Sequence, residues 1–392
     1  MKKLYTADWI LPVSEKPVRN GAILVENGLI ADVNHVAMLS KRYHILPEKF
    51  EKSVIAPAWV NAHCHLELSY LKNLVSRGGS FTSWVRSLVS AREENIEAGR
   101  MQESFTNELE KLSKTGTALV GDLTNGAFLE PVKSETERVV FYELLGFKKD
   151  KAHDLYNNAL AQIEPSRGEI HLAPHALYST SAELVKLILD HGTISTIHIS
   201  ESPDEMIFLN DGSGPMRKFL EEKKVWDDFW KNPGQSPVQY LKKIGALPEK
   251  LILVHGVHFT HDDMALIKDS GNTICLCVRS NNLLGSGMPP VYDFLQYQIP
   301  LCIGTDSLAS NHDLDMNEEV AYLSACFPGL DHAEILKMGT LNGAQALGKG
   351  HEYGALSKGR KARFNVFSGP EIKNMKPETF ILTKSWSTLT CY

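Results

Sequence analysis

Short apolar segments alternate with longer polar stretches through the middle of the chain. Eight of the apolar segments have the length and composition of buried strands: 59–63, 118–122, 139–143, 170–175, 194–198, 251–255, 273–277 and 300–306. Helical periodicity lies between them, as in residues 105–113, 181–189 and 262–268. Such alternation is typical of parallel βα units. It predicts an α/β protein whose residues 57–360 form a (β/α)8 TIM barrel.

The two ends of the chain have a different pattern. Strand-like runs occur at residues 21–26, 29–33, 361–367 and 380–383. Asn27 and Gly28 separate the first two runs, and Asn-Gly between strands is a strong hairpin signal. We therefore expect residues 1–56 and 361–392 to join in one small β domain, a β-sandwich beside the barrel. Two unrelated terminal extensions are the alternative.

Composition narrows the class of protein. A net charge of −6 disfavours binding to nucleic acid or to an anionic membrane. The six cysteines contain no Cys-x-x-Cys pair and mostly occupy apolar segments, which favours free thiols in a reducing compartment. Neither a signal peptide nor a transmembrane run is recognised. We expect a cytoplasmic protein whose partners are a small-molecule substrate and, as one option, a second copy of the chain.

Histidines and an aspartate stand at the ends of the predicted strands. His63 and His65 follow the first strand, and they project together because residues i and i+2 of a strand share a side. His198 ends the fifth strand and Asp306 ends the eighth. The carboxyl ends of barrel strands share one face. These residues therefore predict a site for one divalent metal, with zinc favoured and iron as the alternative.

Other polar residues follow the same set of strands. His175 ends the fourth strand and His255 ends the sixth. A single buried histidine is more often a hydrogen-bonded core residue, but that interpretation does not explain so many at strand ends. Glu201 lies three residues after His198, where chain reversal can bring its carboxylate over the metal. A carboxylate near a metal can transfer protons, whereas the alternative is a solvated loop glutamate before Pro203.

Taken in order, these motifs resemble the amidohydrolase superfamily, in particular its adenosine- and cytosine-deaminase-like branch. The motifs are His63-Cys64-His65, Pro174–Ser179, His198–Glu201, Val254–His258, Val278–Asn281 and Gly304–Asn311. The resemblance covers nearly the whole chain. It implies that the four predicted ligands hold one metal and that Glu201 is the proton shuttle. It also implies that His255 hydrogen-bonds the attacking water or the developing tetrahedral centre.

The fourth predicted strand indicates how many metals to expect. Binuclear relatives bridge two metals with a carboxylated lysine at the end of this strand. Residues 169–175 contain no lysine and end in His175, which resembles a substrate-contacting histidine of nucleoside deaminases. The resemblance therefore implies one metal per chain.

The expected reaction is a hydrolytic deamination of a ring N=C–NH2 group, as found in adenine, guanine, cytosine or pterins. A bound metal lowers the pKa of a water molecule. Asp306 can accept a proton from that water, and Glu201 can protonate the neighbouring ring nitrogen. The C–N bond that breaks is not a peptide bond, and ammonia leaves. The alternative from another functional class is a non-catalytic scaffold that has lost its metal ligands. This chain keeps all four predicted ligands and Glu201.

The substrate is predicted from the segment after the first strand. Glu67 shares the parity of the two histidines before it, so we expect it to contact a ribose hydroxyl or a 5′ substituent. Its alternative role is to brace the barrel mouth. Phe81 and Trp84 could stack on a base, or form an i, i+3 helix face packed on the barrel. The pattern of residues 63–69 with this aromatic pair resembles 6-amino-6-deoxyfutalosine deaminases of menaquinone biosynthesis.

Two alternatives to that substrate stay open. The first is the family of 5′-methylthioadenosine/S-adenosylhomocysteine deaminases, which also act on N6 of an adenine attached to a modified ribose. The second is deamination of another aromatic base, such as guanine, cytosine or a pterin. Further candidates for substrate contact are His175, Arg279, Ser280, Asn281 and Ser307.

Overall fold

The computed structural model describes residues 1–95, 97–166 and 168–392. Eight strands in the middle of the chain form two four-stranded parallel sheets, ordered β6-β7-β8-β9 and β10-β11-β12-β13. Their bounds are β6 Trp59–Cys64, β7 Thr117–Thr124, β8 Glu137–Leu144, β9 Ile170–Pro174, β10 Ser195–Ile199, β11 Leu251–His255, β12 Thr273–Leu276 and β13 Leu301–Ile303. Each of the eight predicted strand segments overlaps one of them.

Backbone contacts link the two parallel sheets at both edges. Ala176, just after β9, bridges to His198 in β10, and Cys64 of β6 bridges to Asp306 just after β13. The amide of Asp306 donates to the carbonyl of His63 at 3.1 Å. Residues at the carboxyl ends of the first and last of the eight strands are therefore neighbours, and the candidate site lies at this end of the strands.

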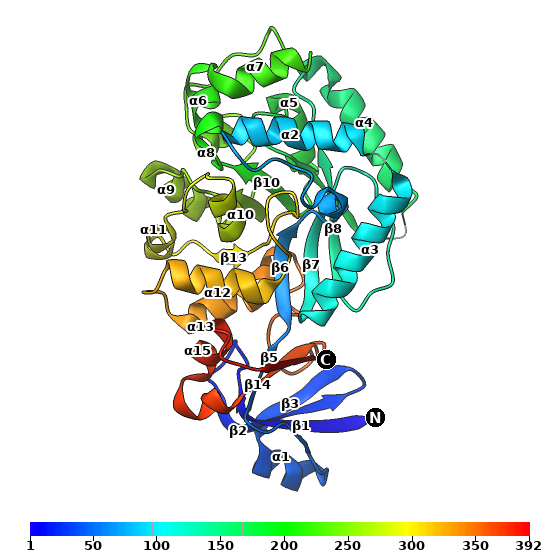
Figure 1. Ribbon diagram of the computed structural model, residues 1–392, viewed down its shortest axis with the longest axis vertical. Helices are drawn as coiled ribbons and strands as arrows, with labels where there is room; N and C mark the ends of the chain where they lie inside the picture. The colour runs from blue at the N-terminus through cyan, green and yellow to red at the C-terminus, as the bar shows by residue number, and fades with distance from the viewer. Residues whose placement is uncertain (96, 167) are drawn as a thin grey trace.

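Helices surround these strands (Figure 1). They are α2 Phe81–Glu94, α3 Ala98–Lys114, α4 Ala152–Ile163, α5 Ala182–Leu189, α6 Pro203–Asp211, α7 Gly214–Glu222, α8 Pro237–Lys243, α9 His261–Ser270, α10 Val278–Leu283, α11 Val291–Gln296, α12 Met316–Cys326, α13 His332–Lys337 and α14 Gly343–Ala346. The helical segments expected at residues 105–113, 181–189 and 262–268 lie in α3, α5 and α9.

Local sequence signals set the ends of these helices. The side chain of Ser181 accepts a hydrogen bond from the amide of Leu184 and caps α5. Thr260 and Asp263 form a reciprocal capping box at the start of α9. Gly271 ends that helix in the left-handed conformation, with φ of 67°, which a glycine adopts without steric cost.

Both ends of the chain contribute to one seven-stranded sheet below the parallel strands (Figure 1). Its strands are β1 Lys2–Ile10, β2 Val18–Glu26, β3 Leu29–His35, β4 Glu48–Lys49, β5 Ser53–Pro57, β14 Phe364–Ser368 and β15 Thr388–Cys391. The order is β15-β14-β5-β1-β2-β3, and β4 pairs with β1. The hairpin expected at Asn27 and Gly28 is present, with both residues at positive φ. The pairing defines one sheet, not the two layers of a β-sandwich. Helix α1 Val36–Tyr43 follows β3.

One predicted strand is wrong. Residues 380–382 of this run belong to helix α15, Pro377–Leu382, Thr383 is its C-cap, and the last strand is β15 instead. Pro377 occupies the first turn, where a proline fits a helix because its missing N–H has no partner there. The apolar residues that looked like a strand are buried against the main core. A run this short does not separate a strand from a buried helix by periodicity.

Buried side chains include a large aromatic residue and most of the cysteines. Trp59 is fully buried, and its indole N–H donates to Asn317 Oδ1 at 2.8 Å. The six cysteines are all free, and four of them are buried. In residues 1–95, 97–166 and 168–392, no helix has both the length and the apolar character needed to cross a membrane.

Candidate active site

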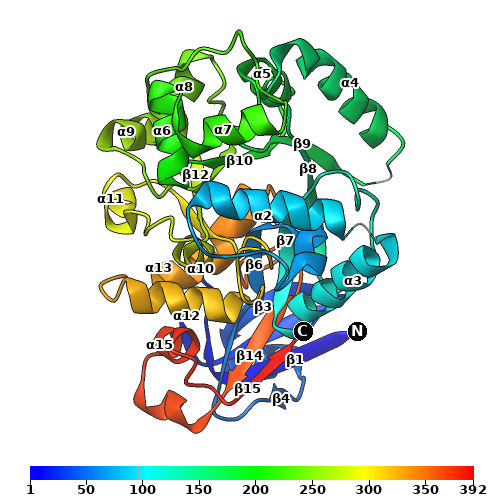
Figure 2. The ribbon, with the colours of Figure 1, turned by 45° about the horizontal axis from the view of Figure 1, so that its top comes forward.

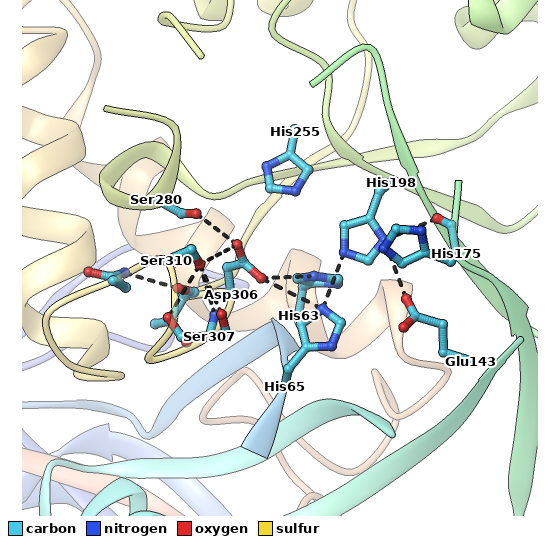
Figure 3. Close-up of polar contacts among 12 residues, drawn as sticks. His63, His65, Glu143, His175, His198, His255, Ser280, Asp306, Ser307 and Ser310 are labelled. Carbon is cyan, nitrogen blue, oxygen red and sulfur yellow. Dashed lines mark hydrogen bonds and ion pairs between the residues drawn. The ribbon is translucent and has the colours of Figure 1, made fainter. Parts of the chain in front are cut away.

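The four predicted metal ligands converge at the ends of β6, β10 and β13 (Figure 3). They are His63, His65, His198 and Asp306, all buried, and one ligand atom from each lies within 4.8 Å of the others. Nε2 of His65 is 3.2 Å from Nε2 of His198 and 3.6 Å from Oδ1 of Asp306. Oδ1 is also 3.8 Å from Nε2 of His63. Three imidazoles and a carboxylate in this arrangement suit a divalent ion.

Neighbouring groups orient two of these ligand atoms. Oδ2 of Asp306 accepts hydrogen bonds from Ser280 Oγ at 2.7 Å and Ser310 Oγ at 2.6 Å, which leaves Oδ1 facing the histidines. Nδ1 of His198 lies 3.0 Å from the carbonyl oxygen of His175. Nδ1 therefore carries the proton, and the lone pair is on Nε2, as metal-binding histidines require. Ser280, a candidate without a predicted role, thus supports Asp306.

Unpaired nitrogens indicate that these residues fit a metal. Neither ring nitrogen of His63 has a hydrogen-bond partner in the described part of the chain, although the side chain is fully buried. Buried polar atoms are rarely left unpaired in proteins. Burial, followed by the effect of His63, lowers the pKa of His65 to about 3. A neutral imidazole has a lone pair available for an ion.

Three residues at these strand ends have a strained backbone conformation. Ser200, His255 and Asp306 have positive φ values of 52°, 76° and 61°. Residues other than glycine rarely adopt this left-handed backbone conformation, and each one destabilises the fold by about 1–3 kcal/mol. Since strained residues persist where the surrounding structure fixes them, this cluster is typical of a functional site.

Glu201 and His255 face one another beside the ligands. Oε1 of Glu201 is 3.6 Å from Nε2 of His255, and Nδ1 of His255 is 2.8 Å from Oδ1 of Asn281. The amide of Asn281 thus keeps the His255 proton on Nδ1 and leaves Nε2 free to accept. Burial, followed by the charges of Asp306 and Glu205, raises the pKa of Glu201 well above its ordinary value. Glu201 is therefore suited to donate a proton.

A cavity lies directly above this cluster. Its lining includes three of the candidate ligands, Glu201 and residues of helix α2. In Figure 2, α2 lies across the strands β6 and β7. Phe81, Trp84 and Leu88 form an apolar wall, and Arg92 follows on the same helix. Phe81 is buried, and the indole N–H of Trp84 donates to the carbonyl of Ala309. A flat apolar group that enters this cavity would meet the wall on one side and the ligands below.

Comparison with known proteins gives the family. The model of the amidohydrolase family matches residues 54–391. The chain belongs to the amidohydrolase family. The resemblance inferred from the sequence motifs is thereby confirmed.

Individual relatives are named as deaminases. The aminodeoxyfutalosine deaminase of Deinococcus radiodurans is 26% identical over 347 residues, which cover 84% of this amidohydrolase and 81% of that protein. A 5-methylthioadenosine/S-adenosylhomocysteine deaminase of Pyrococcus abyssi is 28% identical over 321 residues, or 76% and 70% of the two chains. Among solved structures, Helicobacter pylori aminofutalosine deaminase in complex with methylthio-coformycin has a TM-score of 0.80 at 22% identity, covering 99% of this chain and 97% of that one.

Four residues predicted to touch the substrate of this amidohydrolase line the cavity. They are Phe81, Trp84, His175 and Ser307. Nδ1 of His175 lies 2.6 Å from Ser179 Oγ, and burial lowers the pKa of His175 to about 4. Its imidazole is therefore neutral near neutral pH. Their contact with a substrate stays a prediction.

Glu67 takes a position that strand parity did not predict. It is 3% exposed and does not line the cavity. Its carboxylate accepts from the amide of Asn125 at 2.9 Å and from Thr124 Oγ1, and it pairs with Arg92 at 3.0 Å. The physical reason is that β6 ends at Cys64 and the chain enters a 3-10 turn at 66–71, so the strand alternation stops. These contacts tie the turn after β6 to the end of β7 and to helix α2.

Arg279 is also turned away from the cavity. Its guanidinium pairs with both carboxylate oxygens of Asp313, at 2.7 and 2.9 Å. The backbone amide of Arg279 donates to Glu319 at 3.0 Å. Arg279 does not line the cavity. These contacts anchor the start of α10, which carries Ser280 and Asn281 to their partners in the site.

Sequence reasoning missed three polar residues of the cavity wall. They are Arg92, Asn125 and Glu143. Glu143 ends the third predicted strand, so the strand-end signal that identified His198 and Asp306 also applied to it. No comparable signal marks Arg92, because it reaches the cavity from a helix packed over the strands.

Proposed function

We propose that this amidohydrolase is a metal-dependent hydrolytic deaminase that converts an aminopurine nucleoside and water into the corresponding oxo compound and ammonia. The observation that carries this proposal is the convergence of three histidines and Asp306 with Glu201 and His255 at the floor of one cavity. The deaminase names of the relatives support the same reaction class.

His63, His65, His198 and Asp306 would hold one divalent ion in this proposal. Nitrogen and carboxylate oxygen donors favour zinc, and iron is the alternative. The ion would supply the Lewis acidity that lowers the pKa of an attacking water. The absence of a lysine in the fourth strand supports a single ion.

The protons move through residues of this chain. Glu201, whose pKa is raised by burial, gives a proton to the ring nitrogen next to the reacting carbon and makes that carbon more electrophilic. Oδ1 of Asp306 takes a proton from the attacking water. Nε2 of His255 accepts a hydrogen bond from that water or from the developing tetrahedral centre. The amino group leaves as ammonia after it receives a proton from these carboxyl groups.

The favoured substrate is 6-amino-6-deoxyfutalosine, which would place the protein in menaquinone biosynthesis. The names of one sequence relative and one structural neighbour support this choice. Methylthioadenosine and S-adenosylhomocysteine are the alternative, supported by a second relative. The apolar wall of α2 and the polar residues His175 and Ser307 suit a purine in either case.

We also propose the architecture that the sequence predicted. The eight parallel strands close into a (β/α)8 barrel over residues 57–360, supported by the bridges between the two sheets. Residues 1–56 and 361–392 form the small β domain, which is built on the single seven-stranded sheet. The six free cysteines support a reducing, cytoplasmic environment. A homodimer stays a prediction.

An ammonia-release assay tests the function. Zinc-loaded protein is incubated with 6-aminodeoxyfutalosine, methylthioadenosine, adenosine, adenine and guanine, and ammonia and product mass are measured. We expect ammonia from the N6-amino nucleosides, with the highest kcat/KM for the first. Products without ammonia would indicate ring-opening hydrolysis. No product from any compound would support the non-catalytic scaffold.

A further inference from the structure

Glu143 is a buried carboxyl group of the cavity wall that the proposed reaction does not use. It lies near the end of β8, is 4% exposed and lines the cavity. Figure 3 shows it beside His198, on the side away from Asp306. Its Oε1 atom has no hydrogen-bond partner in the part of the chain that the structure describes. Since Glu201 and Asp306 serve the reaction, Glu143 is the remaining carboxyl of this wall.

Asn125 fixes the other oxygen of Glu143. Oδ1 of Asn125 accepts a hydrogen bond from Arg92 Nη1 at 2.8 Å, so its amide group must point the other way. Nδ2 then donates to Oε2 of Glu143 at 3.1 Å. Arg92 itself pairs with Glu67, with Nη2 3.0 Å from Oε1 of that residue. The network therefore holds the Glu143 carboxyl in place and leaves Oε1 available.

His198 does not satisfy Oε1. Nδ1 of His198 is 3.4 Å from Oε1 of Glu143, but it is closer, at 3.0 Å, to the carbonyl oxygen of His175. This nitrogen carries a single proton, and the shorter contact uses it. Oε1 consequently needs a partner from the cavity, because a buried oxygen without one is unfavourable.

We propose that Oε1 of Glu143 binds a hydroxyl group of the substrate's sugar and makes the enzyme selective for ribonucleosides. This inference rests on the proposed deaminase function. With its amino group at the reacting centre, an adenine nucleoside has only sugar hydroxyls left as hydrogen-bond donors, because its ring nitrogens accept. A hydroxyl both donates and accepts, so it complements the carboxyl group in either protonation state.

A comparison of three nucleosides tests this role. The substrates are 5′-deoxyadenosine, 2′,5′-dideoxyadenosine and 3′,5′-dideoxyadenosine, with kcat/KM and zinc content measured for each protein. We expect the wild type to prefer the first over at least one dideoxy compound by about tenfold or more. Glu143→Ala removes the carboxyl group and should reduce this preference to within about threefold by slowing only the ribonucleoside. Glu137→Ala, at the opposite end of β8, should keep the preference.

Several outcomes would overturn the inference. The first is a wild type without preference, and the second is a Glu143→Ala variant that keeps the preference. The third is a Glu143→Ala variant that loses zinc, which would make Glu143 a positioning residue for His198. If Glu143→Ala does not fold, Glu143→Asp replaces it, because the shorter side chain keeps the carboxyl group and withdraws the oxygen. No ammonia from any nucleoside with the wild type would reject the proposed function itself, and this inference with it.

Discussion

Several side chains of the candidate site are oriented by a hydrogen bond from a second residue. Ser280 holds one oxygen of Asp306, and Asn281 holds one nitrogen of His255. Asn125 does the same for Glu143. Such supporting contacts keep reactive atoms in one orientation, so that binding does not have to order them.

The first prediction at this scale concerns a metal ligand. His198→Ala removes one of three imidazoles, and the remaining ligands should bind the ion much more weakly. We expect wild-type protein to contain about one zinc or iron ion per chain and the variant to lose most of it while staying folded. Elemental analysis and circular dichroism measure both. The exposed His351→Ala serves as the control, and unchanged metal in His198→Ala would remove this residue from the ligand set.

The second prediction concerns the proton donor. Glu201→Gln keeps the shape of the side chain but cannot transfer a proton. We expect kcat to fall on the order of 10²-fold, with metal content and thermal stability unchanged. Steady-state ammonia release measures this effect. A rate within about threefold of the wild type would show that Glu201 is only a loop carboxylate.

The third prediction concerns Glu67. Glu67→Gln weakens its ion pair with Arg92 and its contacts with Thr124 and Asn125, all of which support the cavity wall. We expect the free energy of unfolding to fall by about 1–3 kcal/mol. The kcat/KM values for adenine and for nucleosides should fall by one common factor. Chemical denaturation and kinetics test this, with the exposed Glu103→Gln as the control. A loss confined to nucleosides would restore the substrate contact expected from the sequence.

At the level of elements, helix α2 covers the cavity, and its N-terminal half is tied to helices α6 and α7. Both the amide and the hydroxyl of Thr82 donate to Oδ2 of Asp204 in α6, at 2.9 and 2.6 Å. Further along α2, Arg86 pairs with Glu222 of α7. The position of α2 beside the cavity therefore depends on residues that are not candidate metal ligands.

The fourth prediction follows from this attachment. Asp204→Ala leaves the Thr82 amide unpaired and should loosen the N-terminal half of α2. We expect faster hydrogen exchange in residues 81–94 and a raised KM, with kcat within about threefold because the ligands are untouched. Exchange mass spectrometry and kinetics measure the two effects. Asp211→Ala, at the other end of α6, is the control, and unchanged exchange in α2 would contradict the proposed attachment.

At the level of the whole molecule, the candidate site joins distant parts of the chain, so a bound ion should stabilise the entire fold. The fifth prediction is that chelation lowers the melting temperature by a few degrees and that added zinc restores it. An ion that binds only the folded state, at about 100 times its Kd, contributes roughly 2.7 kcal/mol. Thermal unfolding with and without zinc measures the shift, which His198→Ala should lack. Equal melting temperatures would argue against a metal site.

The sequence alone predicted the eight middle strands, the four candidate metal ligands and the family. Each of the eight middle strands is a short apolar run. Such a run is recognised from local sequence, and the tertiary structure kept all eight of them as strands. His63 and His198 were identified because their place at strand ends also depends only on local sequence. The hairpin at Asn27 and Gly28 was predictable for the same reason, since its turn requires positive φ at both residues.

Only the tertiary structure decided where the other polar side chains point. Glu67 lies beyond the end of its strand, where alternation no longer applies, and Arg279 turns to Asp313 from a residue distant in sequence. Residues 380–382 form a helix because their burial against other helices, and not their own periodicity, sets their conformation. Arg92 reaches the cavity from a covering helix. Each of these outcomes depends on contacts between segments far apart in the chain, and such contacts leave no local pattern in the sequence.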